Sequence, residues 1–236
     1  MPCAALVAWL VLAACGASSR QHDEVVLLGD SIAEETAPYL RELVRPKTLL
    51  DREFGGTAPC DWLDQDLFAK RGRTVVVSFT GNSLTPCMRG SSGDQLRGQA
   101  LVDKYRSDLT ALVTEIRRAG AEVLLVGQPQ RGPAASDGAS GRIAVSGLND
   151  IYEDLATNEG VSFVDAGATV ETADGAFTTT LPCAPGEAQC GPDGRNAVRS
   201  EDGVHLCPVR SPSPCAVYAS GAFRFARAIA AAIIAR

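Results

Sequence analysis

One serine in this sequence has the setting that nucleophilic catalysis requires. Ser31 follows an uninterrupted apolar run at 25–28 and the turn Gly29-Asp30, and a helix-like segment comes after it. A serine there lies between the carboxyl end of a buried strand and the amino end of a helix, where α/β sheets bind ligands and backbone N–H groups face negative charge. A serine hydroxyl is a weak nucleophile at neutral pH and needs a base within hydrogen-bond reach. Ser31 is therefore a candidate nucleophile.

The candidates for the base are few, because the chain holds two histidines, His22 and His205. His22 lies in a polar segment before the first predicted strand, where no packed scaffold could hold it. His205 follows Asp202 by three residues, a spacing that puts the carboxylate on the same side of one turn as the imidazole, where it can accept the Nδ1 proton. Ser31, His205 and Asp202 thus form a candidate triad, and Asp165, at the end of another predicted strand, is the alternative acid.

Three motifs in this order resemble those of the SGNH (GDSL-type) hydrolase family: Gly29-Asp30-Ser31, Gly81-Asn82 and Asp202-x-x-His205. The resemblance covers nearly the whole chain after its first residues. It implies a serine esterase, a lipase-like hydrolase of carboxylic esters, with Ser31 as nucleophile, His205 as base and Asp202, three residues before the histidine, as the acid.

The resemblance also implies which groups would bind the oxyanion. These are the Ser31 N–H, the N–H of a glycine after the second strand, and the side-chain amide of Asn82. Gly56 is the glycine carried over, and Gly55 is the alternative, because one sequence does not settle which amide faces the site. The chain departs from the family at Thr80, where the family often has glycine, so the local turn is expected to differ.

The apolar pattern predicts five strands alternating with four helices. Continuous apolar runs without alternation favour strands that are buried on both faces of a sheet. This alternation predicts a three-layer α/β/α sandwich with a mainly parallel five-stranded sheet, and the resemblance makes it flavodoxin-like. Residues 170–200 contain few apolar residues and are expected to form an irregular insert. The expected strands are 25–28, 47–50, 73–79, 122–127 and 161–164, and the expected helices are 32–44, 100–119, 143–158 and 216–234.

The first residues read as an export signal. Residues 1–14 are apolar and uncharged, and they are too few to span a bilayer as a helix. Small residues before Cys15 resemble a bacterial lipobox, which makes Cys15 a candidate lipidation site, residues 15–23 a tether and residues 24–236 a single hydrolase domain. No Lys or Arg precedes the apolar run, so a simple secretory signal is the alternative. Either reading predicts an exported protein, as a cell-envelope lipoprotein or a secreted one.

The remaining cysteines support export. Their spacing favours three local disulfides, which would staple Pro- and Gly-rich loops. No C-x-x-C spacing occurs and the folded part holds one histidine, so we expect no metal site, and no cofactor is implied. We expect the last bridge to hold the loop that follows His205. The favoured pairs are Cys60 with Cys87, Cys183 with Cys190, and Cys207 with Cys215.

The net charge of −6 argues against a nucleic-acid partner, which would need a basic face. The expected substrate is a small-molecule or carbohydrate ester, such as an O-acyl or O-acetyl group on a carbohydrate or lipid, and the expected contact with a membrane is only through a lipid on Cys15. Arg131 lies on a long loop, where it either contacts an anionic substrate or is solvated. Two other functions stay open: a carbohydrate O-acetyltransferase, and a non-catalytic envelope-binding lipoprotein.

Overall fold

The structure is a computed structural model that describes residues 24–63, 65, 73–135, 143–210 and 215–236. The predicted export signal at 1–14, the predicted tether at 15–23 with Cys15, and His22 lie outside the described residues. Their roles therefore stay predictions.

Five parallel strands form the central sheet, in the order β2-β1-β3-β4-β5. This is a doubly wound order, in which the chain moves outward from β1 in one direction and then, after β2, in the other. Ligands of such sheets bind at the carboxyl ends of the strands where the direction reverses, here between β1 and β3. The strands are β1 (Glu24–Gly29), β2 (Thr48–Glu53), β3 (Thr74–Ser78), β4 (Glu122–Val126) and β5 (Ser162–Val164).

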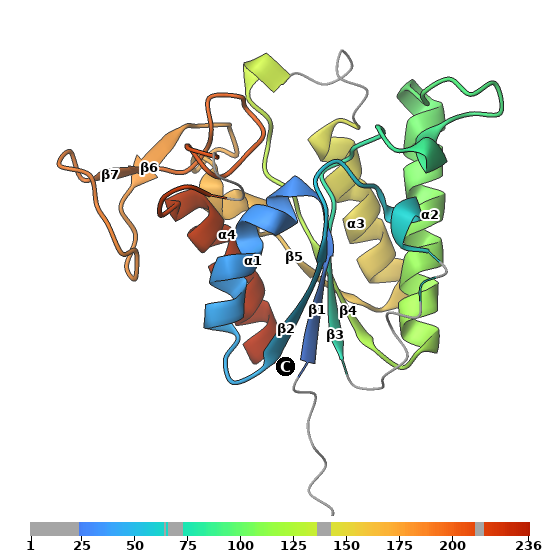
Figure 1. Cartoon of the computed structure of the whole chain (residues 1–236), viewed down its shortest axis with the longest axis horizontal. Coiled ribbons are helices and arrows are strands. Elements are labelled where there is room, and N and C mark those ends of the chain that lie inside the picture. Colours follow the sequence, from blue (N-terminus) through green and yellow to red (C-terminus); the bar gives the residue numbers. More distant parts are fainter. Residues whose placement is uncertain (1–23, 64, 66–72, 136–142, 211–214) are drawn as a thin grey trace, which may run out of the picture.

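Four helices cover the two faces of the sheet (Figure 1), which confirms the predicted three-layer sandwich. One pair, α1 and α4, packs together on one face, and α2 and α3 lie on the other. The bounds are α1 (Ser31–Leu43), α2 (Gly98–Arg118), α3 (Val145–Glu159) and α4 (Ser220–Ile234).

The core is divided by the sheet into two clusters. Val25 and Leu27 of β1 face α1 and α4, whereas Val26 and Leu28 face α2 and α3. All four side chains are buried. Successive residues of a strand point to opposite faces, so a strand covered on both sides must be apolar at every position. This explains why the strand sequences show no alternation.

The segment that was expected to be irregular contains a small antiparallel pair, β6 (Thr180–Pro182) and β7 (Arg195–Ala197). Strands of three residues are too short to show a periodic pattern, so the sequence did not predict them. A buried ion pair between Glu187 and Arg224, with 2.6 Å between the carboxylate and Nε, attaches this segment to α4. The strands β6 and β7 project from one side of the sandwich in Figure 1.

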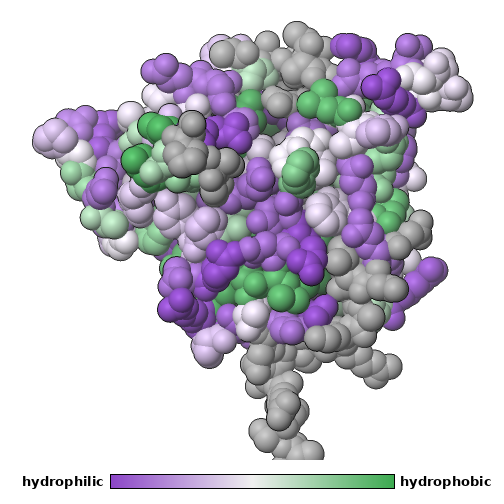
Figure 2. All heavy atoms as spheres, viewed as in Figure 1, coloured by the Kyte–Doolittle hydropathy of each residue, from purple (hydrophilic) through white to green (hydrophobic). Residues whose placement is uncertain are grey.

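The structure contains the three disulfides whose pairing the spacing favoured, Cys60–Cys87, Cys183–Cys190 and Cys207–Cys215. Disulfides persist in oxidising compartments, so their presence fits an extracellular environment. Among the described helices, none has the length and apolar content needed to cross a membrane. On the face shown in Figure 2, hydrophilic residues dominate and the hydrophobic ones form separate groups.

Candidate active site

Ser31 is the first residue of α1 and directly follows the turn that leaves β1. Asp30 caps the helix, because its Oδ1 accepts the N–H of Ile32 at 3.3 Å. Gly29 makes the turn possible, since a Cβ at this position would lie 2.3 Å from the Ser78 carbonyl oxygen and 2.4 Å from the Ala33 Cβ. The turn thus places Ser31, which is 9% exposed, at the carboxyl edge of the sheet.

The other two predicted triad residues meet Ser31 there. His205 Nε2 lies 3.0 Å from Ser31 Oγ, and His205 Nδ1 lies 2.6 Å from Asp202 Oδ2. Both distances are within hydrogen-bond range. The structure therefore brings together a hydroxyl, an imidazole and a carboxylate in line, with the imidazole between the other two. This arrangement can activate a serine as a nucleophile.

Asp202 is held in its ionised form by hydrogen bonds. Its Oδ1 accepts the N–H groups of Val204 at 2.8 Å and of His205 at 3.0 Å, so one carboxylate also shapes the turn. Partial burial opposes the charge, but the bonds from the His205 ring and from the two N–H groups outweigh it and lower the pKa of Asp202 well below its usual range. The alternative acid, Asp165, instead accepts the N–H of Ala168 at 3.1 Å.

The turn between Asp202 and His205 rests on a close contact between two glycines. Gly203 adopts a φ of +76°, and a Cβ there would lie 3.0 Å from the Cα of Gly132. The Gly132 N–H donates to the Gly203 carbonyl oxygen at 2.8 Å. Side chains at either position would separate the two loops, so both glycines are needed for this placement.

Arg199 also stabilises the turn between Asp202 and His205. Its guanidinium is 2% exposed and donates to the carbonyl oxygens of Gly203 at 3.2 Å and Val204 at 2.9 Å. The guanidinium carbon also lies 5.1 Å from the centre of the Phe177 ring. Burial lowers the pKa of Arg199 to about 10, although the nearby negative charges of Glu171 and Asp202 act to raise it. Sequence reasoning missed this role, because nothing in an insert with few apolar residues distinguishes an arginine that will be buried from one on the surface.

The turn with Gly55 and Gly56 lies beside the serine. A Cβ at Gly55 would lie 3.7 Å from the Ser31 Cβ, which puts this backbone next to the nucleophile. Gly56 has a φ of +85°, a conformation that favours glycine. The chain is anchored here by the Phe54 N–H, which donates to the Gly29 carbonyl oxygen at 3.2 Å. Gly56 and Gly55 both stay candidates for the oxyanion donor.

Asn82 is buried at 2% exposure and is bonded to the residue before the nucleophile. Its Nδ2 donates to Asp30 Oδ2 at 2.7 Å, and the same oxygen accepts the N–H and the hydroxyl of Thr80, each at 2.7 Å. Burial raises the pKa of Asp30, and the two Thr80 donors, the Ile32 N–H and the nearby His205 oppose the rise. Sequence reasoning missed the roles of Asp30 and Thr80, although Thr80 stood out as a departure from the family.

Arg131 supports this turn, which corrects the expectation that its charge is solvated. The guanidinium is partly buried, donates to the Ile143 carbonyl oxygen at 2.7 Å and also bonds the Thr80 carbonyl oxygen. It is therefore not a solvated loop charge. Its charge is used to hold the segment that carries Asn82.

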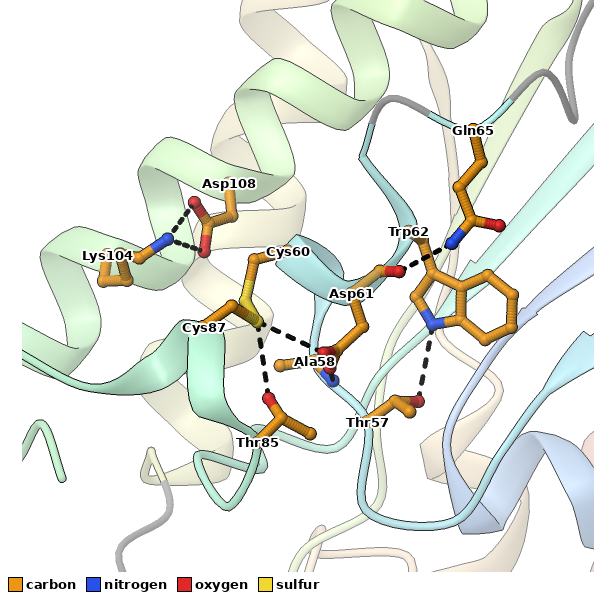
Figure 3. Close-up of a disulfide and its surroundings, with 10 residues drawn as sticks. All are labelled: Thr57, Ala58, Cys60, Asp61, Trp62, Gln65, Thr85, Cys87, Lys104 and Asp108. Carbon is orange, nitrogen blue, oxygen red and sulfur yellow. Dashed lines mark hydrogen bonds and ion pairs between the residues drawn. A yellow bond between two sulfur atoms is a disulfide. The ribbon is translucent and has the colours of Figure 1, made fainter.

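A disulfide connects the two predicted oxyanion segments (Figure 3). Cys60 lies in the short helix Pro59–Trp62, just after Gly56, and Cys87 lies in the short helix Pro86–Met88, just after Asn82. Asp61 caps its own turn by accepting the Ala58 N–H at 2.8 Å. Asp61 and the two cysteines lie close enough to suggest metal ligands, but the sulfurs are joined to each other. The cluster is therefore a covalent link between two loops.

A separate pocket lies away from this site. It is lined by Glu122 and Ser162 at the amino ends of β4 and β5, by Arg117 in the last turn of α2 and by Arg236 after α4. Ligands of open α/β sheets bind at the carboxyl ends of the strands, where the triad lies. The pocket therefore has no part in the arrangement around Ser31.

The fold is that of the SGNH (GDSL-type) hydrolases, as comparison with solved structures shows. An acetyl xylan esterase superposes with a TM-score of 0.56 at 15% identity, covering 89% of this chain and 99% of that chain. A GDSL-like lipase from Bacteroides thetaiotaomicron gives a TM-score of 0.55 at 14% identity, with coverage of 90% and 88%. A variant of an acetyl-xylooligosaccharide esterase from Geobacillus stearothermophilus gives 0.54 at 16% identity, with coverage of 89% and 93%.

Residues 24–209 match the family described as "Protein of unknown function (DUF459)", and the chain belongs to this family. A comparison with curated proteins finds no match.

Proposed function

We propose that this protein is a serine esterase that hydrolyses a carboxylic ester through an acyl-enzyme. The observation that carries the proposal is the line of hydrogen bonds from Ser31 Oγ through the imidazole of His205 to Asp202, with distances of 3.0 and 2.6 Å. It lies at the carboxyl edge of the sheet, where open α/β folds act on their ligands.

The first half of the reaction forms the acyl-enzyme. His205 Nε2 accepts the proton of Ser31 Oγ as this oxygen attacks the ester carbonyl carbon. Asp202 accepts the hydrogen bond of the Nδ1–H and stabilises the imidazolium. The tetrahedral intermediate then expels the alcohol, which takes the proton from Nε2. In the second half, water attacks the acyl group, His205 accepts its proton, and Ser31 leaves with that proton.

Negative charge on the carbonyl oxygen is stabilised by donors around Ser31. The N–H of Ser31 at the start of α1 is one, and the N–H of Gly56 or Gly55 is the second. The side-chain amide of Asn82 is the third. The Asn82 Nδ2 donates to Asp30 Oδ2 at 2.7 Å and to Thr80 Oγ1 at 3.3 Å, which fixes the amide before the substrate binds. In this proposal the longer bond is exchanged for one to the oxyanion.

The substrate class is an O-acyl or O-acetyl ester on a carbohydrate or lipid. The solved structures with this fold include an acetyl xylan esterase and a GDSL-like lipase, which supports ester chemistry and leaves the alcohol open. If the acyl-enzyme were resolved by a sugar hydroxyl in place of water, the protein would be an O-acetyltransferase. Product analysis with an oligosaccharide acceptor separates these two outcomes.

The protein is exported under this proposal, with residues 1–14 as the signal and a lipid on Cys15 as the membrane anchor. The three disulfides support an oxidising location. Metabolic labelling with a radioactive fatty acid tests the anchor: the wild-type chain takes up label and Cys15→Ser does not. A wild-type chain that is exported without label would be a secreted enzyme.

Hydrolysis of p-nitrophenyl acetate by an oxidised form beginning at Gly16 tests the function. Wild type is expected to release p-nitrophenol, and Ser31→Ala is expected to lose the activity while keeping its circular dichroism spectrum. Ser107→Ala, at an exposed position of α2, serves as the matched control and should keep full activity. A folded wild type that hydrolyses no ester of any acyl length would contradict the proposal, as would a Ser31→Ala variant that is fully active.

A further inference from the structure

Glu35 is a completely buried glutamate on the helix that begins with the proposed nucleophile. It lies four residues after Ser31 in α1, one helical turn further along, and its exposure is 0%. Burying a charged carboxylate away from water costs free energy unless opposite charges or hydrogen bonds compensate for it. The groups that bond Glu35 therefore indicate which part of the fold it stabilises.

Those partners all come from the loop that carries His205. Glu35 Oε2 accepts the backbone N–H of Leu206 at 2.7 Å and that of Cys207 at 3.2 Å. The second oxygen, Oε1, accepts a hydrogen bond from the Nε–H of Arg210 at 2.8 Å. Leu206 and Cys207 directly follow His205 in the chain. One side chain thus joins the helix that carries Ser31 to the loop that carries the imidazole.

Glu35 also acts on His205 through its charge. Burial raises the pKa of Glu35, and the nearby His205, the N–H groups of Leu206 and Cys207, and Arg210 oppose the rise. A negative charge beside an imidazole favours the protonated ring, which is the form that arises when Ser31 gives up its proton.

Other charged groups face the same ring from the elements around it. Asp202 bonds the ring from within its own loop, and Asp30 acts on it from the turn after β1. Arg199 supports the loop carbonyls and interacts with both Asp202 and Glu35. Glu35 differs from these groups because it alone bonds the backbone N–H groups that follow the imidazole.

We propose that Glu35 is a positioning residue for His205: it fixes the His205 loop to the nucleophile's helix so that Nε2 stays in reach of Ser31 Oγ, and its charge stabilises the imidazolium. The role of the imidazole in this statement rests on the proposed esterase function. The attachment of the loop to α1 does not depend on that function.

Three substitutions separate the attachment of the His205 loop from the effect of the Glu35 charge. Glu35→Gln keeps an oxygen for the two N–H groups and removes the charge. Glu35→Asp keeps the charge but withdraws the carboxylate by one methylene group, and Glu35→Ala removes both. We expect kcat to fall about 10²-fold in Glu35→Ala with KM little changed, because misplacing a reacting group by about 1 Å has an effect of this size. Glu35→Gln should recover most of this loss, and its acid limb of kcat/KM should move to lower pH.

Glu187 offers a matched control outside the site. It is a buried glutamate too, bonded to Arg224 Nε at 2.6 Å and to the Ala184 N–H at 2.8 Å, and it lies in the loop between β6 and β7. Glu187→Gln and Glu187→Ala should lower the unfolding temperature while leaving kcat and the pH profile of the folded enzyme unchanged. If the Glu35 and Glu187 variants lost activity only in proportion to their stability, the proposal would be wrong.

One measurement needs no substrate and so distinguishes this proposal from the esterase function. Amide hydrogen exchange at Leu206 and Cys207 should speed up about tenfold or more in Glu35→Asp and Glu35→Ala, but not in Glu35→Gln. Unchanged exchange in Glu35→Asp would overturn the proposal even if Glu35→Ala failed to fold.

Discussion

Asn82 donates a 2.7 Å hydrogen bond to Asp30, so the predicted oxyanion donor is attached to the residue that precedes the nucleophile. The two lie at the ends of the neighbouring strands β1 and β3, in which Gly29 pairs with Ser78. The pairing of β1 with β3 therefore brings Asp30 and the segment that carries Asn82 together.

Replacing Asn82 by alanine is expected to lower kcat by roughly 10²- to 10³-fold, the usual effect of losing one oxyanion donor. KM should be less affected, because the bond strengthens as charge develops on the oxygen. Steady-state kinetics on p-nitrophenyl acetate gives both values. A change confined to KM would instead identify Asn82 as a ground-state substrate contact.

Asp30→Asn tests the support behind that donor. An asparagine side chain has one acceptor oxygen where the carboxylate has two. If its NH₂ group took the place of Oδ2, it would face the donors of Thr80 and Asn82. We expect a loss of about 1 to 3 kcal/mol in the free energy of unfolding, the effect of unpaired buried donors. We also expect a fall in kcat at constant KM. Chemical denaturation and kinetics measure the two effects, and Thr80→Val, which removes one hydroxyl donor, should show a smaller version of both.

Asp202→Asn should lower kcat by about 10⁴-fold, because the amide favours the wrong imidazole tautomer. The folded Asp202 ionises at lower pH than an unfolded aspartate, so the ionised group adds stability at every pH above 3.8. This contribution is lost as the pH falls below that value toward the lower folded pKa. The unfolding temperatures of wild type and Asp202→Asn should therefore differ at neutral pH and converge in acid; a constant difference would contradict the assignment.

Glu53 should act on stability in the opposite sense. Burial, and then the charges of Asp51 and Glu34, raise its pKa from 4.5 to about 7. Its buried Oε2 has no hydrogen-bond partner among the described residues. The folded chain therefore holds this proton longer than the unfolded chain does, and stability falls as pH rises from 4.5 to about 7.

The matching measurement for Glu53 is the unfolding temperature of Glu53→Gln against pH. The variant should equal wild type near pH 4.5 and exceed it above neutrality by about 2 to 4 °C, which corresponds to roughly 1 kcal/mol for a domain of this size. Glu42→Gln, an exposed change on α1, is the control and should follow wild type throughout. A Glu53→Gln advantage that is the same at all pH values would show that charge is not the cause.

The disulfide between Cys60 and Cys87 should matter for activity as well as for stability. Replacing both cysteines by serine opens a loop of 27 residues and should cost about 3 to 4 kcal/mol, whereas opening the 7-residue loop of Cys183 and Cys190 should cost about 2 to 3 kcal/mol. Because the first bridge joins the two predicted oxyanion segments, only its removal should lower kcat of the folded enzyme. Equal kcat in both double variants would show that the segments hold their places without the bond.

Patterns local in sequence were enough to predict the architecture, and contacts across the sheet were not predictable. The apolar runs around Val25 and Val75 had to be buried strands, and the helical spacing of α2 was equally clear. The motif residues gave Ser31, Asp202 and His205. Asp30 received no role, because its partner Asn82 lies 52 positions away and meets it only through strand register. Glu35 was missed for a similar reason: a glutamate in an amphipathic helix is usually solvated, and its partners lie 171 positions or more away.

The distance along the chain between Ser31 and His205, 174 positions, has a consequence for synthesis. A growing chain makes the serine turn long before it makes the imidazole and the helix that packs behind the imidazole's loop. Until then, the nucleophile has neither a base nor the loop that Glu35 holds. In the proposed esterase, activity would therefore appear only after synthesis has passed His205 and the loop that carries it has folded onto α1.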